Sequence, residues 1–436
     1  MISSIIFIVL LAAGVFLFTK NVRKIIRNIN LGRDLKIDDH KAERWKMMSM
    51  VAIGQSKMMV RPVAGFFHIL IYVGFVIINI EVLEIIIDGI AGTHRIFSFM
   101  GVFYDFLIGS FELLALGVLV ACIIFFVRRN FLKIKRFWSA EMTPWPRSDA
   151  NIILISEILL MSAFLKMNAC DSILQQQEFG HYVKAGFFPV SSFLVPFFSG
   201  YSNESLVFIE RICWWFHIVG ILIFLNYVPY SKHFHIFLAF PNTWYGKLTP
   251  KGEFTNLEAV TNEVKLMMDP SLTPPPVDPN AAPMRFGAQD VQDLSWKQLM
   301  DAYSCTECGR CTSSCPANIT GKKLSPRKIM MDTRDRVTEV GNNIDKHGKD
   351  YSDGKTLLGN YISEEELWAC TTCNACAEAC PINIDPLSII IDLRRFLVME
   401  QSSAPAELNG MFTKIENNQA PWQFSPADRL NWVNQD

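Results

Sequence analysis

The sequence predicts an all-α protein in which a bundle of five membrane-spanning helices precedes an α-helical C-terminal domain. Half of the 436 residues are hydrophobic and the net charge is only −1, a composition typical of membrane proteins. Long apolar runs fill the first 240 residues, and almost none follow. After residue 290 apolar positions recur at helical spacing behind cap residues, without an alternating β pattern. The length leaves room for two domains, so we predict a membrane domain over residues 1–240 and a separate helical domain after it.

Five segments are apolar enough to cross a bilayer, which takes about 20 residues per helix. They lie near residues 2–19, 63–87, 106–127, 151–174 and 207–230. The fourth has the weakest signal, because it contains Glu157 and Lys166. The first has no basic residue before its apolar core and no small-residue cleavage site, so we expect a retained anchor rather than a signal peptide.

The charges of the connecting loops predict the orientation. Lys and Arg are frequent in the first and third loops, whereas the second loop has only Arg95 and the fourth only Lys184, with Arg211 at its edge. The positive-inside rule therefore places the N-terminus outside and the C-terminal domain in the cytoplasm. We expect a multi-pass protein of the bacterial cytoplasmic (inner) membrane, in contact with lipid, and its cysteines suit a reducing compartment.

Two copies of one cysteine pattern, C-x2-C-x2-C-x3-C-P, lie 65 residues apart in the C-terminal domain. In this pattern three cysteines bind one cubane cluster, and the fourth reaches the other cluster of a two-cluster ferredoxin. The spacing predicts two [4Fe-4S] clusters, one bound by Cys305, Cys308, Cys311 and Cys380, the other by Cys370, Cys373, Cys376 and Cys315. Two zinc sites are the alternative, but they usually need two distant C-x2-C pairs and no third cysteine. The remaining cysteines, Cys122, Cys170 and Cys213, lie within spans and are expected to pack as small apolar residues.

Three histidines are candidate haem ligands, because ionisable groups inside a span are costly and tend to be functional. His68 lies in the second span, and His217 and His235 lie in and just beyond the fifth. The latter two are 18 residues apart, or five turns, so an unbroken helix would carry both on one face unless Pro229 bends it. Matching depth pairs His68 with His235 around one haem b and leaves His217 without an evident partner. We expect one haem; the alternatives are two haems, no haem, or His233 in place of His235.

Acidic residues in or near the spans have two interpretations. Glu81 and Glu84 are expected to end the second helix at the outer interface. Glu112 and Glu157 stay open between a structural role and carrying protons to a quinone site.

The remaining organisation follows from composition. Residues 241–290 are expected to form a Pro-rich linker, extended over 267–285. Residues 291–400 are expected to form an α-helical di-cluster ferredoxin domain, with helix starts at Ser295, Ser325, Ser363 and Asp385 and a polar loop over 341–359. Residues 401–436 form an amphipathic tail with Trp422, Phe424, Arg429 and Trp432, which either clasps a partner or folds back over the clusters.

These motifs resemble two known families. The double cysteine pattern, with Leu324-Ser-Pro-Arg327 after the first copy and Arg394-Arg395 after the second, resembles the iron–sulfur subunit of heterodisulfide reductases. The first half resembles the five-helix, nitrate reductase gamma-like cytochrome b subunit, and the resemblance makes His68, His217 and His235 haem ligands. The second ligand position on the second helix is Ile78 here, a departure from the family pattern that counts against an outer haem.

The chain contains no Cys-Cys dipeptide, which the catalytic subunit of that reductase family carries in Cys-Cys-Gly phrases, and no dinucleotide or phosphate-binding glycine motif. No residue is singled out as catalytic, and no nucleic-acid partner is expected. We expect a membrane-anchored electron-transfer subunit of a heterodisulfide-reductase-like oxidoreductase. It would pass electrons between the (mena)quinone pool and a cytoplasmic Cys-Cys-Gly-type or flavoprotein partner. The alternative is a membrane anchor or scaffold with structural clusters and no haem.

Overall fold

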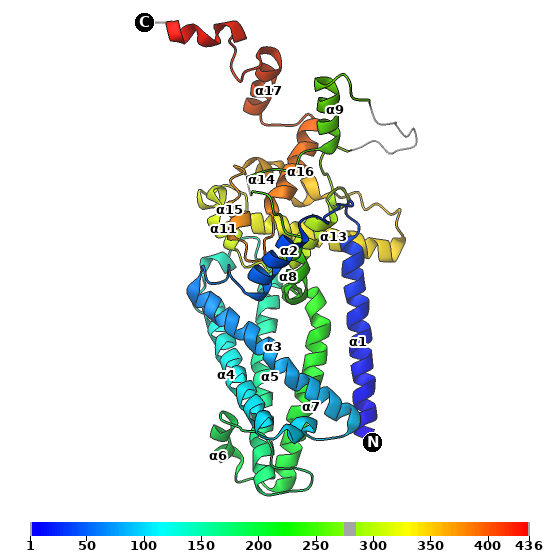
Figure 1. The fold of residues 1–436 in the computed structure, drawn as a ribbon, viewed down its shortest axis with the longest axis vertical. Coiled ribbons are helices and arrows are strands. Elements are labelled where there is room, and N and C mark those ends of the chain that lie inside the picture. Colours follow the sequence, from blue (N-terminus) through cyan, green and yellow to red (C-terminus); the bar gives the residue numbers. More distant parts are fainter. Residues whose placement is uncertain (1, 251, 274–284, 435–436) are drawn as a thin grey trace.

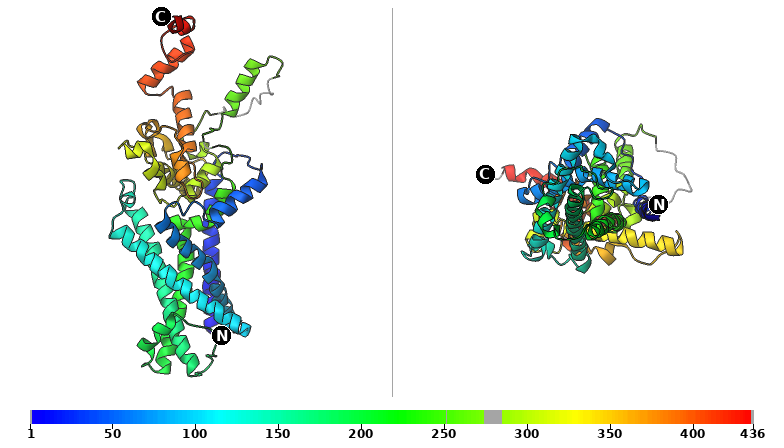
Figure 2. Two further views of the ribbon diagram at one scale, coloured as in Figure 1. Left: turned by 60° about the vertical axis from the view of Figure 1, so that its left-hand side comes forward. Right: turned by 90° about the horizontal axis from the view of Figure 1, so that it is seen from below.

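The computed structural model describes residues 2–250, 252–273 and 285–434, and these form helices joined by loops (Figure 1). Within these ranges there is no β-strand, only two isolated bridges. The expected all-α fold is therefore confirmed. The molecule is elongated: a helical bundle forms one end, the C-terminal domain covers that bundle, and the tail projects beyond the domain (Figures 1 and 2).

Five helices are long and apolar enough to cross a membrane, as the sequence predicts. They are α1 (Ile2–Ile29), α3 (Pro62–Ala91), α4 (Val102–Asn130), α5 (Pro144–Gln176) and α7 (Asn203–Tyr227). Pro62 and Pro144 begin their helices in the first turn, where a missing N–H costs nothing. The chain thus has a multi-pass membrane architecture.

The bundle consists of four helices packed in sequence and a fifth helix at their edge. Helices α3, α4, α5 and α7 contact one another in sequence, and α1 stands at the edge against α3 and α7 (Figure 1). Phe7 of α1 fills a notch on α3, where a Cβ on Gly89 would lie 2.6 Å from its ring. Apolar side chains such as Phe16 and Val102 stay exposed, as expected of a surface that faces lipid.

A buried polar network closes the end of the bundle remote from the C-terminal domain. Arg95 donates to Asp171 (2.6 Å), Asn168 (3.0 Å) and the hydroxyl of Tyr104 (3.1 Å). Glu84 accepts from the same hydroxyl (2.9 Å). The expectation that Glu81 and Glu84 end the second helix is wrong, because α3 continues to Ala91 and both carboxylates turn inward.

Glu112 is part of the same network. Its carboxylate accepts from the backbone N–H groups of Val190 (2.8 Å) and Ser191 (3.0 Å) and from Asn168 (3.0 Å). These contacts fasten the loop before α6 (Val195–Phe198) to α4 and support the structural interpretation of Glu112.

The opposite end of the bundle carries short helices that lie between it and the C-terminal domain. They are α2 (Lys41–Met48), a π-helical turn (Ser49–Ile53) and α8 (His235–Trp244). Arg44 of α2 is buried and donates to Asp39 (2.6 Å) and to the carbonyl of Gly246 (2.9 Å), which ties α2 to the end of α8.

The C-terminal domain is a compact set of helices around a core that includes Leu299, Ile329, Leu367 and Leu393. Its helices are α10 (Trp296–Ser304), α11 (Arg310–Ser314), α12 (Pro316–Ile319), α13 (Pro326–His347), α14 (Glu364–Trp368), α15 (Ala375–Ala379) and α16 (Pro386–Met399). The expected caps form: Ser295, Ser325, Ser363 and Asp385 each accept from a backbone N–H of the first turn. The polar loop expected from residue 341 starts later, because α13 continues to His347.

Helix α1 extends about ten residues beyond its expected span and packs against the C-terminal domain. Ile25 and Ile29 join the core of that domain, and Lys24 pairs with Asp345 of α13 (3.1 Å). The expected linker contains a helix, α9 (Glu258–Met268), and residues 274–284 of the expected extended stretch lie outside the described residues. In the tail, α17 (Ala406–Asn418) buries no residue, so it does not fold back over the C-terminal domain (Figure 2).

Candidate metal centres

The two cysteine motifs adopt the same backbone conformation. The second residue after the first cysteine is left-handed in both, at Glu307 (φ 54°) and Thr372 (φ 56°), and so is the residue after the second cysteine, at Gly309 (φ 70°) and Asn374 (φ 59°). Each motif then begins a short helix, and these two helices, α11 and α15, pack together. The repeat seen in the sequence is therefore also a structural repeat.

Besides its left-handed backbone, the lack of space for a side chain favours glycine at position 309. A Cβ at this position would lie 2.6 Å from Nη1 of Arg327, the fully buried arginine of the Leu324-Ser-Pro-Arg327 phrase. The first motif is thus packed more tightly than the second, which has Asn374 at the matching position.

None of the eight motif cysteines forms a disulfide. Cys380 of the second motif lies close enough to Cys305 and Cys308 of the first to interact with them electrostatically. Cys315 of the first motif lies equally close to Cys370 and Cys376 of the second. The fold therefore brings the fourth cysteine of each motif near the other motif, and the assignment of the cluster ligands stays a prediction.

Backbone N–H groups point at the cysteine sulfurs. Thr372 N–H donates to Sγ of Cys370 (3.4 Å), and Ile384 N–H donates to Sγ of Cys380 (3.3 Å). Such bonds favour thiolate sulfur and tune the potential of a bound cluster.

Three histidines meet where the bundle joins the C-terminal domain. The ring centres of His68 and His235 are 6.4 Å apart, and those of His233 and His235 are 5.6 Å apart. Nδ1 of His235 donates to the carbonyl of Lys232 (3.0 Å), so its Nε2 keeps a free lone pair. Nδ1 of His68 is buried and has no hydrogen-bond partner among the described residues.

The unbroken helix considered for His217 and His235 is wrong. Helix α7 ends at Tyr227, 3-10 turns follow at Val228–Tyr230 and Lys232–Phe234, and His235 begins α8. Ser231 caps the second turn by accepting from His233 N–H (3.1 Å), so Pro229 is not the only cause of the break. His217 lies apart, with its Nδ1 donating to the carbonyl of Leu160 (3.1 Å) and its ring near Phe164.

The first cysteine motif faces the bundle and is surrounded by basic side chains. Arg61 donates to Ser313 (2.7 Å), and Arg310 donates to the carbonyl of Lys57 (2.9 Å). Arg136 lies near Cys308, and burial, together with the neighbouring Arg61, lowers its pKa to about 10. Positive charge in this position suits the negative charge of a cluster held by thiolates.

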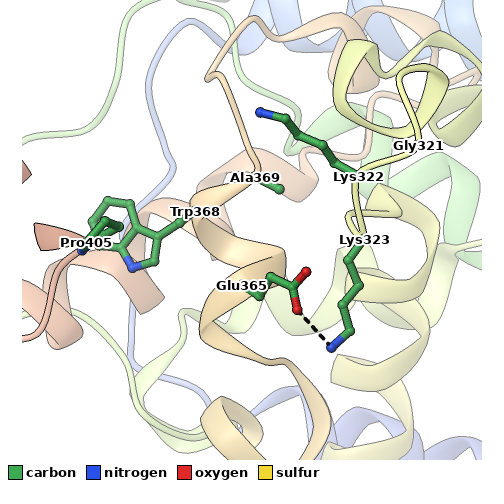
Figure 3. A pocket seen from close by; sticks show the side chains of 7 residues that line it. All are labelled: Gly321, Lys322, Lys323, Glu365, Trp368, Ala369 and Pro405. Carbon is green, nitrogen blue, oxygen red and sulfur yellow. Dashed lines mark hydrogen bonds and ion pairs between the residues drawn. The ribbon is translucent and has the colours of Figure 1, made fainter. Parts of the chain in front are cut away.

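The second motif exposes Cys373, and its end contacts the bundle side, where Lys57 donates to the carbonyls of Glu378 (3.3 Å) and Cys380 (3.2 Å). Beside the motif is a hollow of about 670 Å³, lined by Gly321, Lys322, Lys323, Glu365, Trp368, Ala369 and Pro405 (Figure 3). Lys323 pairs with Glu365 across this hollow (3.3 Å). Its wall at Trp368 and Ala369 leads directly into Cys370.

Sequence reasoning missed Glu307, which lies within the first motif, and Lys232 and Arg136, which approach that motif from the bundle side. A signal existed for Glu307, because the two motifs differ at this position, with Glu in one and Thr in the other. Lys232 and Arg136 carried none beyond their place in basic loops.

Comparison with known proteins supports the iron–sulfur interpretation. Residues 304–384 match the family described as a 4Fe-4S dicluster domain. The chain is 28% identical to the probable iron–sulfur-binding oxidoreductase FadF of Bacillus subtilis, over 99% of this chain and 60% of that protein. It is 26% identical to the EtfAB:quinone oxidoreductase of Syntrophomonas wolfei, over 91% of this chain and 55% of that protein.

A shorter match covers the cluster region. The chain is 35% identical to a subunit of the ferredoxin/F(420)H(2)-dependent CoB-CoM heterodisulfide reductase of Methanosarcina acetivorans, over 27% of this chain and 60% of that protein. No solved structure matches the chain. The chain spans little more than half the length of the first two relatives. The homologues of this chain are heterodisulfide-reductase-like iron–sulfur oxidoreductases, and its C-terminal half carries their 4Fe-4S dicluster domain.

Proposed function

We propose that this chain is a membrane-anchored electron-transfer subunit that connects a membrane quinone with a cytoplasmic redox partner through one haem b and two [4Fe-4S] clusters. One observation carries the proposal. The His68–His235 pair lies at the end of the bundle that contacts the first cysteine motif through Arg61 and Ser313, and Cys373 of the second motif is exposed. Such an order suits electrons that move stepwise between buried centres.

The cluster ligands are Cys305, Cys308, Cys311 and Cys380 for the cluster nearer the membrane. Cys370, Cys373, Cys376 and Cys315 bind the cluster nearer solvent. The two groups of neighbouring thiols and the N–H groups aimed at sulfur support this assignment.

The histidine pair fits one haem iron. Two imidazoles bound to one metal ion at about 2 Å each would have ring centres roughly 6 Å apart, close to the 6.4 Å between His68 and His235, so these two residues would hold the haem iron. His235 already donates its Nδ1 proton to a carbonyl, the usual arrangement of a metal-binding histidine. His217 is assigned no haem, because its ring lies against Phe164 and pairs with no second histidine ring among the described residues. A bound haem would supply a one-electron carrier within the bundle.

The partners follow from the two ends of this path. A relative named as a quinone oxidoreductase supports quinone as the membrane reactant. At the other end, the hollow beside Cys370 is the proposed docking point for the partner, a Cys-Cys-Gly-type or flavoprotein subunit (Figure 3). The basic first and third loops support an orientation with the C-terminal domain in the bacterial cytoplasm and the N-terminus outside.

The test is a measurement of iron, haem and optical spectrum on the detergent-purified protein. We expect about eight irons from two clusters and one b-type haem band in the reduced-minus-oxidised spectrum. His68→Ala and His235→Ala should lose the haem and keep the irons. His217→Ala is the matched control and should keep both. Eight irons without haem in the wild type would instead favour the scaffold with structural clusters.

A further inference from the structure

We propose that Lys232 and Glu307 form a positioning pair that joins the haem-binding segment to the first cluster and sets the electron equilibrium between them. The inference rests on the proposed function and deepens it. Neither residue touches the reacting atoms, so both act through their neighbours, His235 and the first cysteine loop.

Lys232 contacts both sides of this junction. Its backbone carbonyl accepts from Nδ1 of His235 (3.0 Å), and its ammonium group forms an ion pair with the carboxylate of Glu307. The same ammonium donates to the carbonyl of Pro146 (2.7 Å) and lies 3.7 Å from Asp149. The side chain is only 10% exposed, so the pair is held in one arrangement and poorly screened by water.

Glu307 lies inside the first cysteine motif, between Cys305 and Cys308. Its second carboxylate oxygen accepts from Arg334 (2.8 Å), and its carbonyl accepts from Arg327 (3.4 Å). Both carboxylate oxygens of this buried side chain are paired with a cation, one with Lys232 and the other with Arg334. The carboxylate is therefore a fixed negative charge next to the cluster ligands.

The second motif shows that the cysteine loop itself does not need a glutamate here. Thr372 has the same left-handed backbone, and its hydroxyl donates only to the neighbouring carbonyl of Thr371 (2.7 Å). A left-handed conformation is costly for Glu, and burying a charge costs more. At Glu307 the ion pair with Lys232 offsets both costs. At Thr372 no charge is buried, so no such pair is needed. The difference between the repeats therefore marks a junction to the membrane helices.

The two charges have opposite effects on an added electron. Removing the Lys232 ammonium takes a cation away from the haem segment and from the first cluster, so both become harder to reduce. Removing the Glu307 carboxylate leaves Lys232 and Arg334 without their anion, so the first cluster becomes easier to reduce. When both charged groups are removed, their two effects on the ease of reduction should largely cancel. If the pair had only a structural role, removing each charge alone would not change the ease of reduction in opposite directions.

The test compares Lys232→Met, Glu307→Thr and the double variant with wild type, in the full detergent-purified protein. Glu307→Thr gives the first motif the residue of the second, Thr372→Ala is the matched control, and Lys232→Arg should restore the wild-type values. The readouts are iron and haem content, and midpoint potentials from optical and electron paramagnetic resonance titrations. We expect shifts equivalent to about a tenfold change in the electron equilibrium, or about 59 mV for one electron. They should be downward in Lys232→Met, upward in Glu307→Thr and small in the double variant.

Fully loaded variants with unchanged potentials, or with shifts of the same sign, would overturn the inference. If Glu307→Thr does not load iron, Lys232→Met decides the matter alone, because it leaves the cysteine loop unaltered. A wild-type protein with eight irons and no haem would refute the haem part of the proposed function. The potential of the first cluster would then still uphold or overturn the charge effect of the pair.

Discussion

Arg327 donates several of the hydrogen bonds that join the C-terminal domain to the bundle. It is fully buried and donates to the carbonyl of Arg136 (2.6 Å), the hydroxyl of Ser139 (2.7 Å) and the carboxylate of Glu141 (2.6 Å). All three belong to the loop between α4 and α5. A planar guanidinium can serve these acceptors together, whereas a lysine offers a single point charge.

We expect Arg327→Ala to destabilise the contact by roughly 3–5 kcal/mol, because it leaves the carboxylate of Glu141, whose side chain is only 9% exposed, without its cation. Arg327→Lys should be intermediate. The measurement is the temperature at which the purified protein loses its iron–sulfur absorbance. Lys323→Ala is the control, since Lys323 forms an exposed pair with Glu365, which is worth roughly 1 kcal/mol or less. Equal melting temperatures for Arg327→Ala and Lys323→Ala would contradict this assignment.

At the scale of the elements, the two cysteine loops differ at a further informative position besides Glu307 and Thr372. Gly309 and Asn374 are both left-handed, a conformation that Gly and Asn adopt at low cost. The room for a side chain at these two positions differs, however, because a Cβ on Gly309 would lie 2.6 Å from Arg327.

We therefore expect Gly309→Asn to lose iron from the protein and Asn374→Gly to retain it. The first change forces Arg327 out of its buried site, whereas the second only gives the second motif the residue of the first. Iron per chain after purification measures both. Full iron content in Gly309→Asn would show that the packing around Arg327 can adjust.

Local signals explain which elements were predictable from sequence. The five spans and the helix starts at Ser295 and Ser363 follow from apolar length and capping residues. The break between α7 and α8 was not predictable, because it also depends on Ser231, whose hydroxyl donates to Asp149 on another helix (2.6 Å). The inward turn of Glu84 likewise depends on a distant tyrosine, Tyr104.

At the scale of the whole molecule, the tail stands apart from the domain that precedes it (Figure 2). Its helix α17 buries no residue, and Trp422, Phe424 and Trp432 are exposed. We expect deletion of residues 404–436 to leave iron content and melting temperature unchanged. A loss of iron in the truncated protein would instead favour the interpretation in which the tail covers the clusters.

The arrangement of the two cluster sites also predicts the order in which iron can be removed. The first motif is covered by the bundle through Arg61 and Arg310, whereas Cys373 of the second motif is exposed. A water-soluble oxidant with a chelator should therefore reach the second cluster first. We expect biphasic release, with about four of about eight irons lost early. Cys373→Ala should abolish the early phase, and Arg61→Ala, which loosens the cover of the first motif, should accelerate the late one. Release in a single phase, or an early phase that survives Cys373→Ala, would show that the bundle does not shield the first cluster. It would also remove the reason for placing that cluster between the histidine pair and the solvent-exposed one.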